Sequence, residues 1–280
     1  MSRITKNEVE SLLKLLVDDN RFVSEAAAHR LYEIADDAHE QILRVTEGNN
    51  LVLQLRARKI LDRRRLDNYQ KTFVNFARSS HLDLEDGCKI ICLEDFYPTE
   101  AESISTQLDD MAAELALTYP KEASHEVQAD AICNFVFETK GFRGNRENYY
   151  TLDNSFMNRV IESRRGIPLT LGVFLILLGK RLDFTFRPIS VPTHFLLHFG
   201  NDPEANYLDP FNAGRKLTRQ NCVDFLKKVG VVPHPSHLEP VDTRQVLARM
   251  LRNLAAIYHQ AKSHRHAEII EQRIQILLDA

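Results

Sequence analysis

Apolar residues recur at helical spacing through the first 80 residues of the chain, in stripes at 9–16 and 23–34. Residues three and four positions apart share one face of a helix, so these stripes predict amphipathic helices. A weak repeat relates residues 23–31 to residues 52–60. It leaves two alternatives for residues 1–80: a HEAT-like helical extension, or plain amphipathic helices that pack on the following domain.

The helical pattern continues beyond this region and then becomes almost uniformly apolar. Helical spacing is found in three further segments, 88–96, 104–117 and 129–137. Residues 168–181 are apolar on nearly every side, which predicts a helix that is buried all round. Pro168 suits the first turn of this helix, because its missing N–H would have no partner there in any case.

After the buried helix the hydrophobic period falls towards two, which is typical of strands. Short strands are predicted at 184–191, 194–199 and 207–208. Helical spacing returns at 221–229 and then in two helices near the end of the chain, at 245–261 and 266–278. The pattern as a whole predicts a helix-rich α+β protein.

Composition narrows the class of protein. The 280 residues include 36 Lys and Arg against 39 Asp and Glu, a net charge of −3 that argues against a generically basic nucleic-acid binder. The N-terminus has no apolar stretch of signal-peptide length, and the longest apolar run, at 167–179, is too short to span a bilayer. Four cysteines in so long a chain are not a disulfide framework. We therefore expect a cytoplasmic protein that binds neither nucleic acid nor membrane.

Charge is segregated along the chain. Residues 56–71 carry seven basic residues and two acidic ones, whereas residues 83–114 carry ten acidic residues and one lysine. The basic run is either a patch for phosphate or an acidic partner, or a solvated helix face that lies opposite the protein's own acidic segment. The histidines and cysteines offer no zinc-binding spacing, so we expect no metal and no cofactor.

One pair of residues could carry chemistry. His194 opens a predicted strand, and Asp209 follows 15 residues later, after one hairpin, so we predict a hydrogen bond between them across neighbouring strands. Such a pair is either a structural hydrogen bond or a general base with its orienting acid.

Six motifs in this order resemble the SirB-type branch of the transglutaminase-like superfamily. They are GFRGN at 141–145, YY at 149–150, NSF at 154–156, RRGIPLT at 164–170, PTHFL at 192–196 and LDPF at 208–211. The resemblance implies a transglutaminase-like core, a buried central helix packed on a small antiparallel sheet. It also implies a domain at 81–230 with a helical lead-in, and a tetratricopeptide-like hairpin at 241–280.

The resemblance places His194 and Asp209 where the active members have their His and Asp, but those members also have a Cys in the first turn of the buried helix. Here that turn contains no cysteine, and Thr170 is its only hydroxyl group. Three residues into a helix, a threonine hydroxyl usually satisfies backbone groups, so Thr170 is a candidate nucleophile only if the protein is an enzyme.

Four further residues are candidates for binding. Arg164 and Arg165 precede the buried helix, where they could hold an anionic group or a peptide carboxylate, or could pair with neighbouring acids. Asn154 and Thr193 lie within the motifs that flank the predicted site.

These observations favour a transglutaminase-like protein without the nucleophilic cysteine, a pseudoenzyme that binds a protein or peptide partner. The alternative is a peptide or amide hydrolase or acyltransferase, in which His194 and Asp209 act on water or on Thr170. A third hypothesis is a scaffold with a vestigial pocket. The geometry of the pocket distinguishes them.

Overall fold

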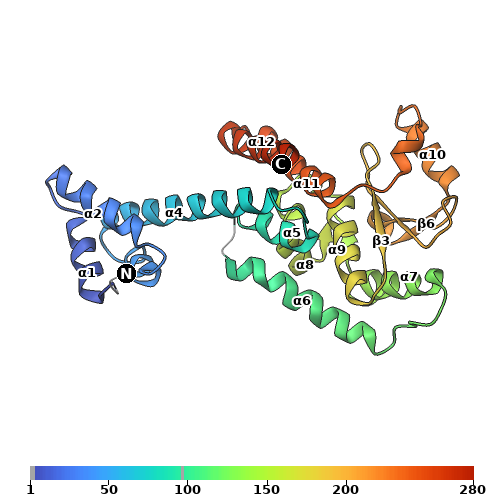
Figure 1. The fold of residues 1–280 in the computed structure, drawn as a ribbon, viewed down its shortest axis with the longest axis horizontal. Coiled ribbons are helices and arrows are strands. Elements are labelled where there is room, and N and C mark those ends of the chain that lie inside the picture. Colours follow the sequence, from blue (N-terminus) through green and yellow to red (C-terminus); the bar gives the residue numbers. More distant parts are fainter. Residues whose placement is uncertain (1–3, 96–97) are drawn as a thin grey trace. The chain divides into compact units, whose positions relative to one another are not determined.

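The computed structural model describes residues 4–95 and 98–280 and is rich in helices (Figure 1). The chain divides into two compact units, Met1–Phe73 and Val74–Ala280. Each unit has its own buried core, and we describe them separately.

The described part of the first unit consists of α1 (Lys6–Leu15), α2 (Arg21–Glu33), α3 (His39–Val45) and most of α4 (Leu51–Ala77). Thr5 and Asn20 cap α1 and α2, because their side chains accept backbone N–H groups of the first turns. The core of the unit is formed by apolar residues of all four helices, among them Val9, Leu13, Leu31, Ile42 and Ile60. The amphipathic helices predicted here are therefore present. Their HEAT-like character stays a prediction.

The second unit begins with a group of helices. They are α5 (Leu84–Cys92), α6 (Pro98–Ala116), α7 (His125–Cys133), which continues as a π-helix to Thr139, and α8 (Met157–Ser163). Phe156 occupies the N-cap position of α8 and makes no side-chain cap bond.

The central helix of the second unit is α9 (Pro168–Arg181), with Pro168 in its first turn as predicted. Eleven of its 14 residues are buried, while Ile176 is half-buried. It packs against α6, α7 and α8 and against the strands β3 (Phe186–Ile189) and β4 (Leu196–Phe199). Gly172 permits one close approach: a Cβ atom there would lie 2.6 Å from the ring of Phe195, the residue after His194. The buried helix thus supports the segment that carries the predicted base.

A four-stranded antiparallel sheet lies beside α9, in the order β3 (Phe186–Ile189), β4 (Leu196–Phe199), β5 (Tyr207–Asp209) and β6 (Arg215–Leu217). Strand β6 was not predicted, because three residues between turns are too short to show alternation. The same holds for the two-residue parallel pair β1 (Arg143–Gly144) and β2 (Arg165–Gly166). The α+β fold class is confirmed.

The unit ends with α10 (Arg219–Lys228), α11 (Thr243–Gln260) and α12 (His264–Asp279). A short connection joins α11 and α12, and the two helices pack against each other. The helix α11 also contacts α5. The predicted helical pair at the C-terminus is present, whereas its tetratricopeptide-like character stays a prediction. Among the residues that the structure describes, no helix combines the length and apolarity needed to cross a membrane.

Candidate functional site

His194 and Asp209 are brought together at the open end of the β4–β5 hairpin, where β4 begins and β5 ends. The Nε2 atom of His194 lies 3.0 Å from the Oδ1 atom of Asp209, and both side chains are nearly buried, at 12% and 9% exposed. His194 lies two residues before β4, in the turn that leads into it, and not in the strand itself as we expected. The predicted contact between the two side chains is present. Its role in a reaction stays a prediction.

The Asp209 carboxylate is held by several donors. Its Oδ1 atom accepts the backbone N–H groups of Phe211, at 3.0 Å, and of Asn212, at 3.2 Å, and its Oδ2 atom accepts the side-chain amide of Asn212 at 2.6 Å. Burial raises the pKa of this carboxyl, but the bond and charge of His194 and the bonds from Asn212 outweigh burial. The net result is a pKa below the usual 3.8. Asp209 is therefore ionised at neutral pH and orients the imidazole.

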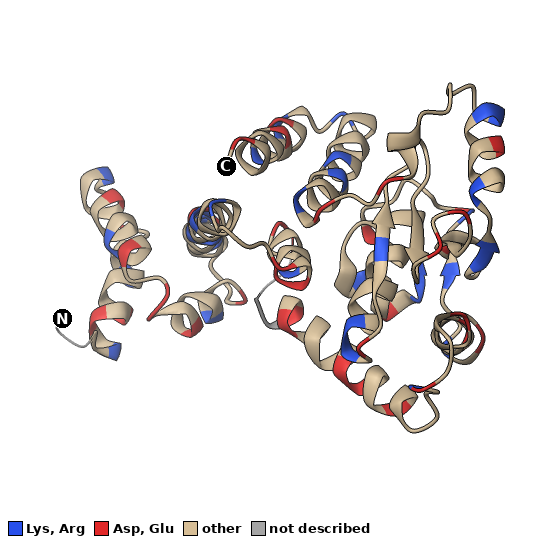
Figure 2. Cartoon of the chain, turned by 45° about the vertical axis from the view of Figure 1, so that its right-hand side comes forward, with Lys and Arg blue, Asp and Glu red and all other residues tan. Residues whose placement is uncertain are grey.

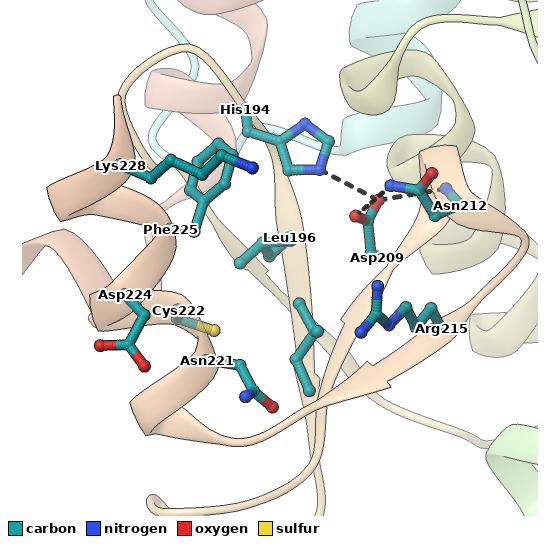
Figure 3. A pocket seen from close by; sticks show the side chains of 11 residues that line it. His194, Leu196, Asp209, Asn212, Arg215, Asn221, Cys222, Asp224, Phe225 and Lys228 are labelled. Atoms are coloured by element: carbon teal, nitrogen blue, oxygen red, sulfur yellow. Dashed lines mark hydrogen bonds and ion pairs between the residues drawn. The ribbon is translucent and has the colours of Figure 1, made fainter. Parts of the chain in front are cut away.

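The other nitrogen of His194 is available. Within residues 4–95 and 98–280 its Nδ1 atom makes no hydrogen bond, and in Figure 3 it points away from Asp209. In a neutral imidazole that donates Nε2–H to a carboxylate, Nδ1 carries the lone pair. The geometry therefore offers a hydrogen-bond acceptor or a general base.

A chain of polar groups continues behind Asp209. Asn212 donates to Asp209 and accepts a hydrogen bond from Arg146, whose guanidinium also lies 4.8 Å from the ring centre of Phe211. Gly144 makes this packing possible, since a Cβ atom there would meet the Phe211 ring at 2.6 Å. The GFRGN motif thus supports the residues that orient Asp209.

The turn before β4 is fixed by hydrogen bonds from α11, one of the C-terminal helices. Thr193 adopts a left-handed conformation, with φ of +63°, and the N–H of His194 donates to the carbonyl of Val191 at 3.2 Å. Arg249 of α11 donates to the same carbonyl at 2.9 Å and to the hydroxyl of Ser190 at 2.7 Å. The helix α11 therefore fixes the position of the turn that carries His194.

A pocket of about 490 Å³ opens beside this pair, between the sheet and α10 (Figure 3). Leu196, Leu217 and Phe225 give it apolar walls, and Cys222 also lines it. Its polar lining beyond the His–Asp pair comes from β6, α10 and the turn after β5, and consists of Asn212, Arg215, Asn221, Asp224 and Lys228. We call it the His194 pocket.

Two cationic side chains, Arg215 and Lys228, line the His194 pocket. Arg215 lies directly opposite Asp209 in the register of β5 and β6, yet neither it nor Lys228 forms an ion pair with any described residue. The Asp209 carboxylate is bonded instead by His194, Phe211 and Asn212. Along the chain, Arg215 is the closer of the two to Asp209, and in Figure 3 the Lys228 side chain extends towards His194.

None of the four cysteines offers a thiolate to this pocket. All four are buried thiols. Burial, together with the nearby charge of Asp209, raises the pKa of Cys222, the cysteine that lines the His194 pocket, to about 12. Burial likewise raises the pKa of Cys92 to about 11 and that of Cys133 to about 12, and it raises the pKa of Cys88 as well.

Thr170 and Asn154 contact each other, but neither residue lines the His194 pocket. The hydroxyl of Thr170 donates to the backbone carbonyl of Asn154 at 2.9 Å and accepts the N–H of Ile167 at 3.2 Å. The side-chain amide of Asn154 donates to two backbone carbonyls, those of Asn148 and Tyr149. Both residues are 1% exposed, and their polar groups hold the loop that precedes α9.

The remaining binding candidates lie on the surface. Arg164 and Arg165 are exposed, and Arg143 joins them, because it is paired with Arg165 in the β1–β2 register. None of these three forms an ion pair with a described residue. Thr193 is exposed as well, and neither it nor the arginines line the His194 pocket.

A buried helix packed on a small antiparallel sheet, with a His in the turn before one strand and an Asp at the end of the next, is typical of a transglutaminase-like domain. Comparison of the sequence with known families agrees, because the pattern of the transglutaminase-like superfamily matches residues 102–252, more than half of the chain. The chain belongs to the transglutaminase-like superfamily.

Its relatives include bacterial and animal proteins. A UPF0162 protein of Xylella fastidiosa (strain 9a5c) is 31% identical over 193 residues, which cover 67% of this chain and 63% of the relative. A UPF0162 protein of Vibrio cholerae is 35% identical over 143 residues, covering 50% and 52%. F-box only protein 21 of Mus musculus is 29% identical over 159 residues, covering 54% and 24%. The chain thus spans less than two thirds of each of these relatives, and no solved structure matches it significantly.

Several residues of the pocket were not found from the sequence. Cys222, Arg215 and Lys228 follow the last recognisable motif, and only the fold brings α10 back over His194. Asn212 directly follows the LDPF motif and Arg146 directly follows GFRGN, so their positions beside motifs were the available signal. In the described part of the chain, no three His, Cys, Asp or Glu side chains are arranged to hold a metal ion.

The pairing of Asp209 predicts a pH-dependent contribution to stability. Because its folded pKa lies below 3.8, the contribution is complete above about pH 4 and is lost as the pH falls through the folded value. We expect Asp209→Asn to lower the free energy of unfolding by about 1–3 kcal/mol at pH 6. In urea denaturation at pH 3 and below, the gap to the parent should shrink. A gap that is unchanged between pH 6 and pH 2 would contradict this environment for Asp209.

Proposed function

We propose that this chain is a SirB-type transglutaminase-like protein whose His194 pocket binds a protein or peptide segment without cysteine chemistry. The observation that supports this most strongly is the state of Cys222. It is the cysteine that lines the pocket, and it is 1% exposed with a pKa of about 12. At neutral pH such a thiol stays protonated, so it is a poor nucleophile.

The lining of the pocket indicates what kind of segment it would accept. Leu196, Leu217 and Phe225 suit an apolar side chain, while Arg215 and Lys228 suit a carboxylate next to it. Asp224 also lines the pocket, and Gln220 donates to it at 2.8 Å. We therefore propose a ligand that has one carboxylate beside one apolar side chain.

A second candidate function rests on the His–Asp pair itself. An ionised Asp209 at Nε2 and an unbonded Nδ1 atom are the arrangement of a general base that activates water. Such an enzyme would hydrolyse a peptide or amide bond without a covalent intermediate. The bonded hydroxyl of Thr170 argues against threonine as the nucleophile.

Binding can be tested by NMR with simple probes. We expect acetyl-Ala-Phe with a free carboxylate to shift the resonances of His194 and Arg215 at millimolar concentration, and its C-terminal amide to bind at least about fivefold more weakly. The double variant Arg215→Gln, Lys228→Gln should lose the response. The matched control is Lys227→Gln, on the same helix but outside the lining, and it should retain the response. Equal binding of acid and amide would contradict the proposed ligand.

A further inference from the structure

A second hollow lies in the first unit, outside the region that matches the superfamily. It has a volume of about 620 Å³ and is formed by α2, α4 and the residue that follows α1. Leu16, Ala28 and Ile60 give it an apolar floor. Its walls carry four basic residues, Arg21, Arg56, Lys59 and Arg63. We call it the basic groove. Figure 2 shows the Lys and Arg positions of its helices in blue and the Asp and Glu positions in red.

The cations contributed by α4 form a row on one helix face. Arg56, Lys59 and Arg63 are spaced at i, i+3 and i+7, which places them along about 10 Å of one side of the helix. All three are exposed. A row of this kind matches carboxylates that are spaced in the same way on a partner.

These cations are not neutralised by acids of the described residues. Lys59 forms no ion pair with them, Arg56 donates to the backbone carbonyl of Leu16, and Arg63 lies 5.2 Å from the ring centre of Tyr32. Of the four basic residues, Arg21 pairs with Glu25, at 2.7 Å. Three positive charges therefore face the solvent without a counter-charge.

The acidic segment at residues 83–114 was one of the two alternatives for what lies opposite the basic run. Several of its acids form ion pairs within the second unit. Asp83 pairs with Lys180 at 2.7 Å, and Glu85 and Asp109 both pair with Arg181, at 2.8 and 2.5 Å. Such ion pairs account for several of the acids in 83–114. This favours an external anionic partner for the basic groove.

Exposed apolar side chains accompany the cations. Val52 and Leu55 precede the row on α4 and are 50% and 59% exposed, and Phe22, beside Arg21 on α2, is 84% exposed. Large apolar side chains next to unpaired cations suit a partner that also has both kinds of group.

From this arrangement we infer that the basic groove is a docking site for an acidic protein segment that carries apolar side chains between its carboxylates. A nucleic acid fits less well. The Tyr32 ring, which lines the groove, already has the guanidinium groups of Arg63 and Arg64 over it, at 5.2 and 5.4 Å, and these would compete with a stacking base.

The inference can be tested with the full chain and synthetic probes. The first probe is a fluorescent, acetylated 14-residue peptide with Glu and Leu at helical spacing. The others are its Gln-for-Glu analogue and a ten-nucleotide oligothymidylate of the same label. In anisotropy titrations at low salt, the acidic peptide should bind at least about tenfold more tightly than the other two, and added salt should weaken its binding.

A single charge reversal locates the site. Lys59→Glu should weaken binding of the acidic peptide at least about fivefold, because Lys59 has no structural partner to lose. The matched control is Lys71→Glu, which makes the same change at an exposed position of the same helix outside the groove, and it should bind within about twofold of the parent. Circular dichroism would verify that both variants are folded.

Three results would overturn the inference. They are equal binding of the Glu and Gln peptides, tighter binding of the oligonucleotide, and equal effects of the two lysine variants. A His194→Ala variant, which alters the other pocket, should leave binding of the acidic peptide unchanged. Loss of binding in that variant would also refute the basic groove as the site.

Discussion

Replacing Glu94 by alanine is expected to lower the free energy of unfolding by about 3–5 kcal/mol. Glu94 follows α5 and forms an ion pair with Arg273 of α12. Both side chains are almost fully buried, at 4% and 3% exposed. Removal of the carboxylate leaves a guanidinium group in a site from which water is largely excluded, and that costs far more than an exposed pair would. Urea denaturation of the parent and the variant measures the difference.

A double variant separates the loss of the pair from the burial of an unpaired charge. Glu94→Leu combined with Arg273→Met replaces both charges with apolar side chains of similar size, and it should recover most of the stability lost in Glu94→Ala. If Glu94→Ala unfolds within about 1 kcal/mol of the parent, the buried pair does not hold the C-terminal helices as the structure indicates.

The second large effect is expected in the central helix. Leu175 of α9 is fully buried, so Leu175→Ala should cost about 2–5 kcal/mol through lost transfer free energy and the cavity that remains. We expect the midpoint of urea denaturation to fall accordingly.

The neighbouring residue is the matched control for Leu175. Ile176 is half-buried, and Ile176→Ala should therefore cost less, below about 2 kcal/mol. The opposite order, with Ile176 costing more than Leu175, would contradict the packing of α9 in the second unit.

The pattern of the sequence was sufficient for the main elements of the fold. Residues 168–181 are apolar on nearly every side, a pattern that is typical of a buried helix. Strands with clear alternation were found, whereas β6 and the β1–β2 pair were missed, because two or three residues carry no measurable period. Backbone pairing in the folded chain, and not local propensity, determines these short strands.

Part of the candidate site could be predicted from the order of strands and turns along the chain. His194 and Asp209 are separated by one hairpin, and a hairpin brings the ends of its strands together. The partners from α10 could not be predicted, since the helix returns to the pocket through tertiary packing. Arg164 and Arg165 precede the central helix as expected, but Arg164 ends α8 with φ of +56° and both side chains are exposed.

The sequence also could not distinguish a reactive hydroxyl from a structural one. Thr170 lies where a nucleophile would be expected, but its Oγ1 atom bonds the N–H of Ile167 and the carbonyl of Asn154. A threonine in the first turn of a helix is well placed for such backbone bonds. The distinction depends on what surrounds the hydroxyl, and that follows only from the fold.

The central claim is that this transglutaminase-like domain performs no cysteine-dependent acyl transfer. The most direct measurement compares amine incorporation and peptide hydrolysis by three proteins: the parent, a variant with all four cysteines replaced by Ala or Ser, and His194→Ala. We predict no activity that depends on cysteine, so the parent and the folded cysteine-free variant should behave alike. Activity that survives cysteine removal and fails in His194→Ala would favour the water-activating enzyme. Activity in the parent that disappears in the folded cysteine-free variant would contradict the account.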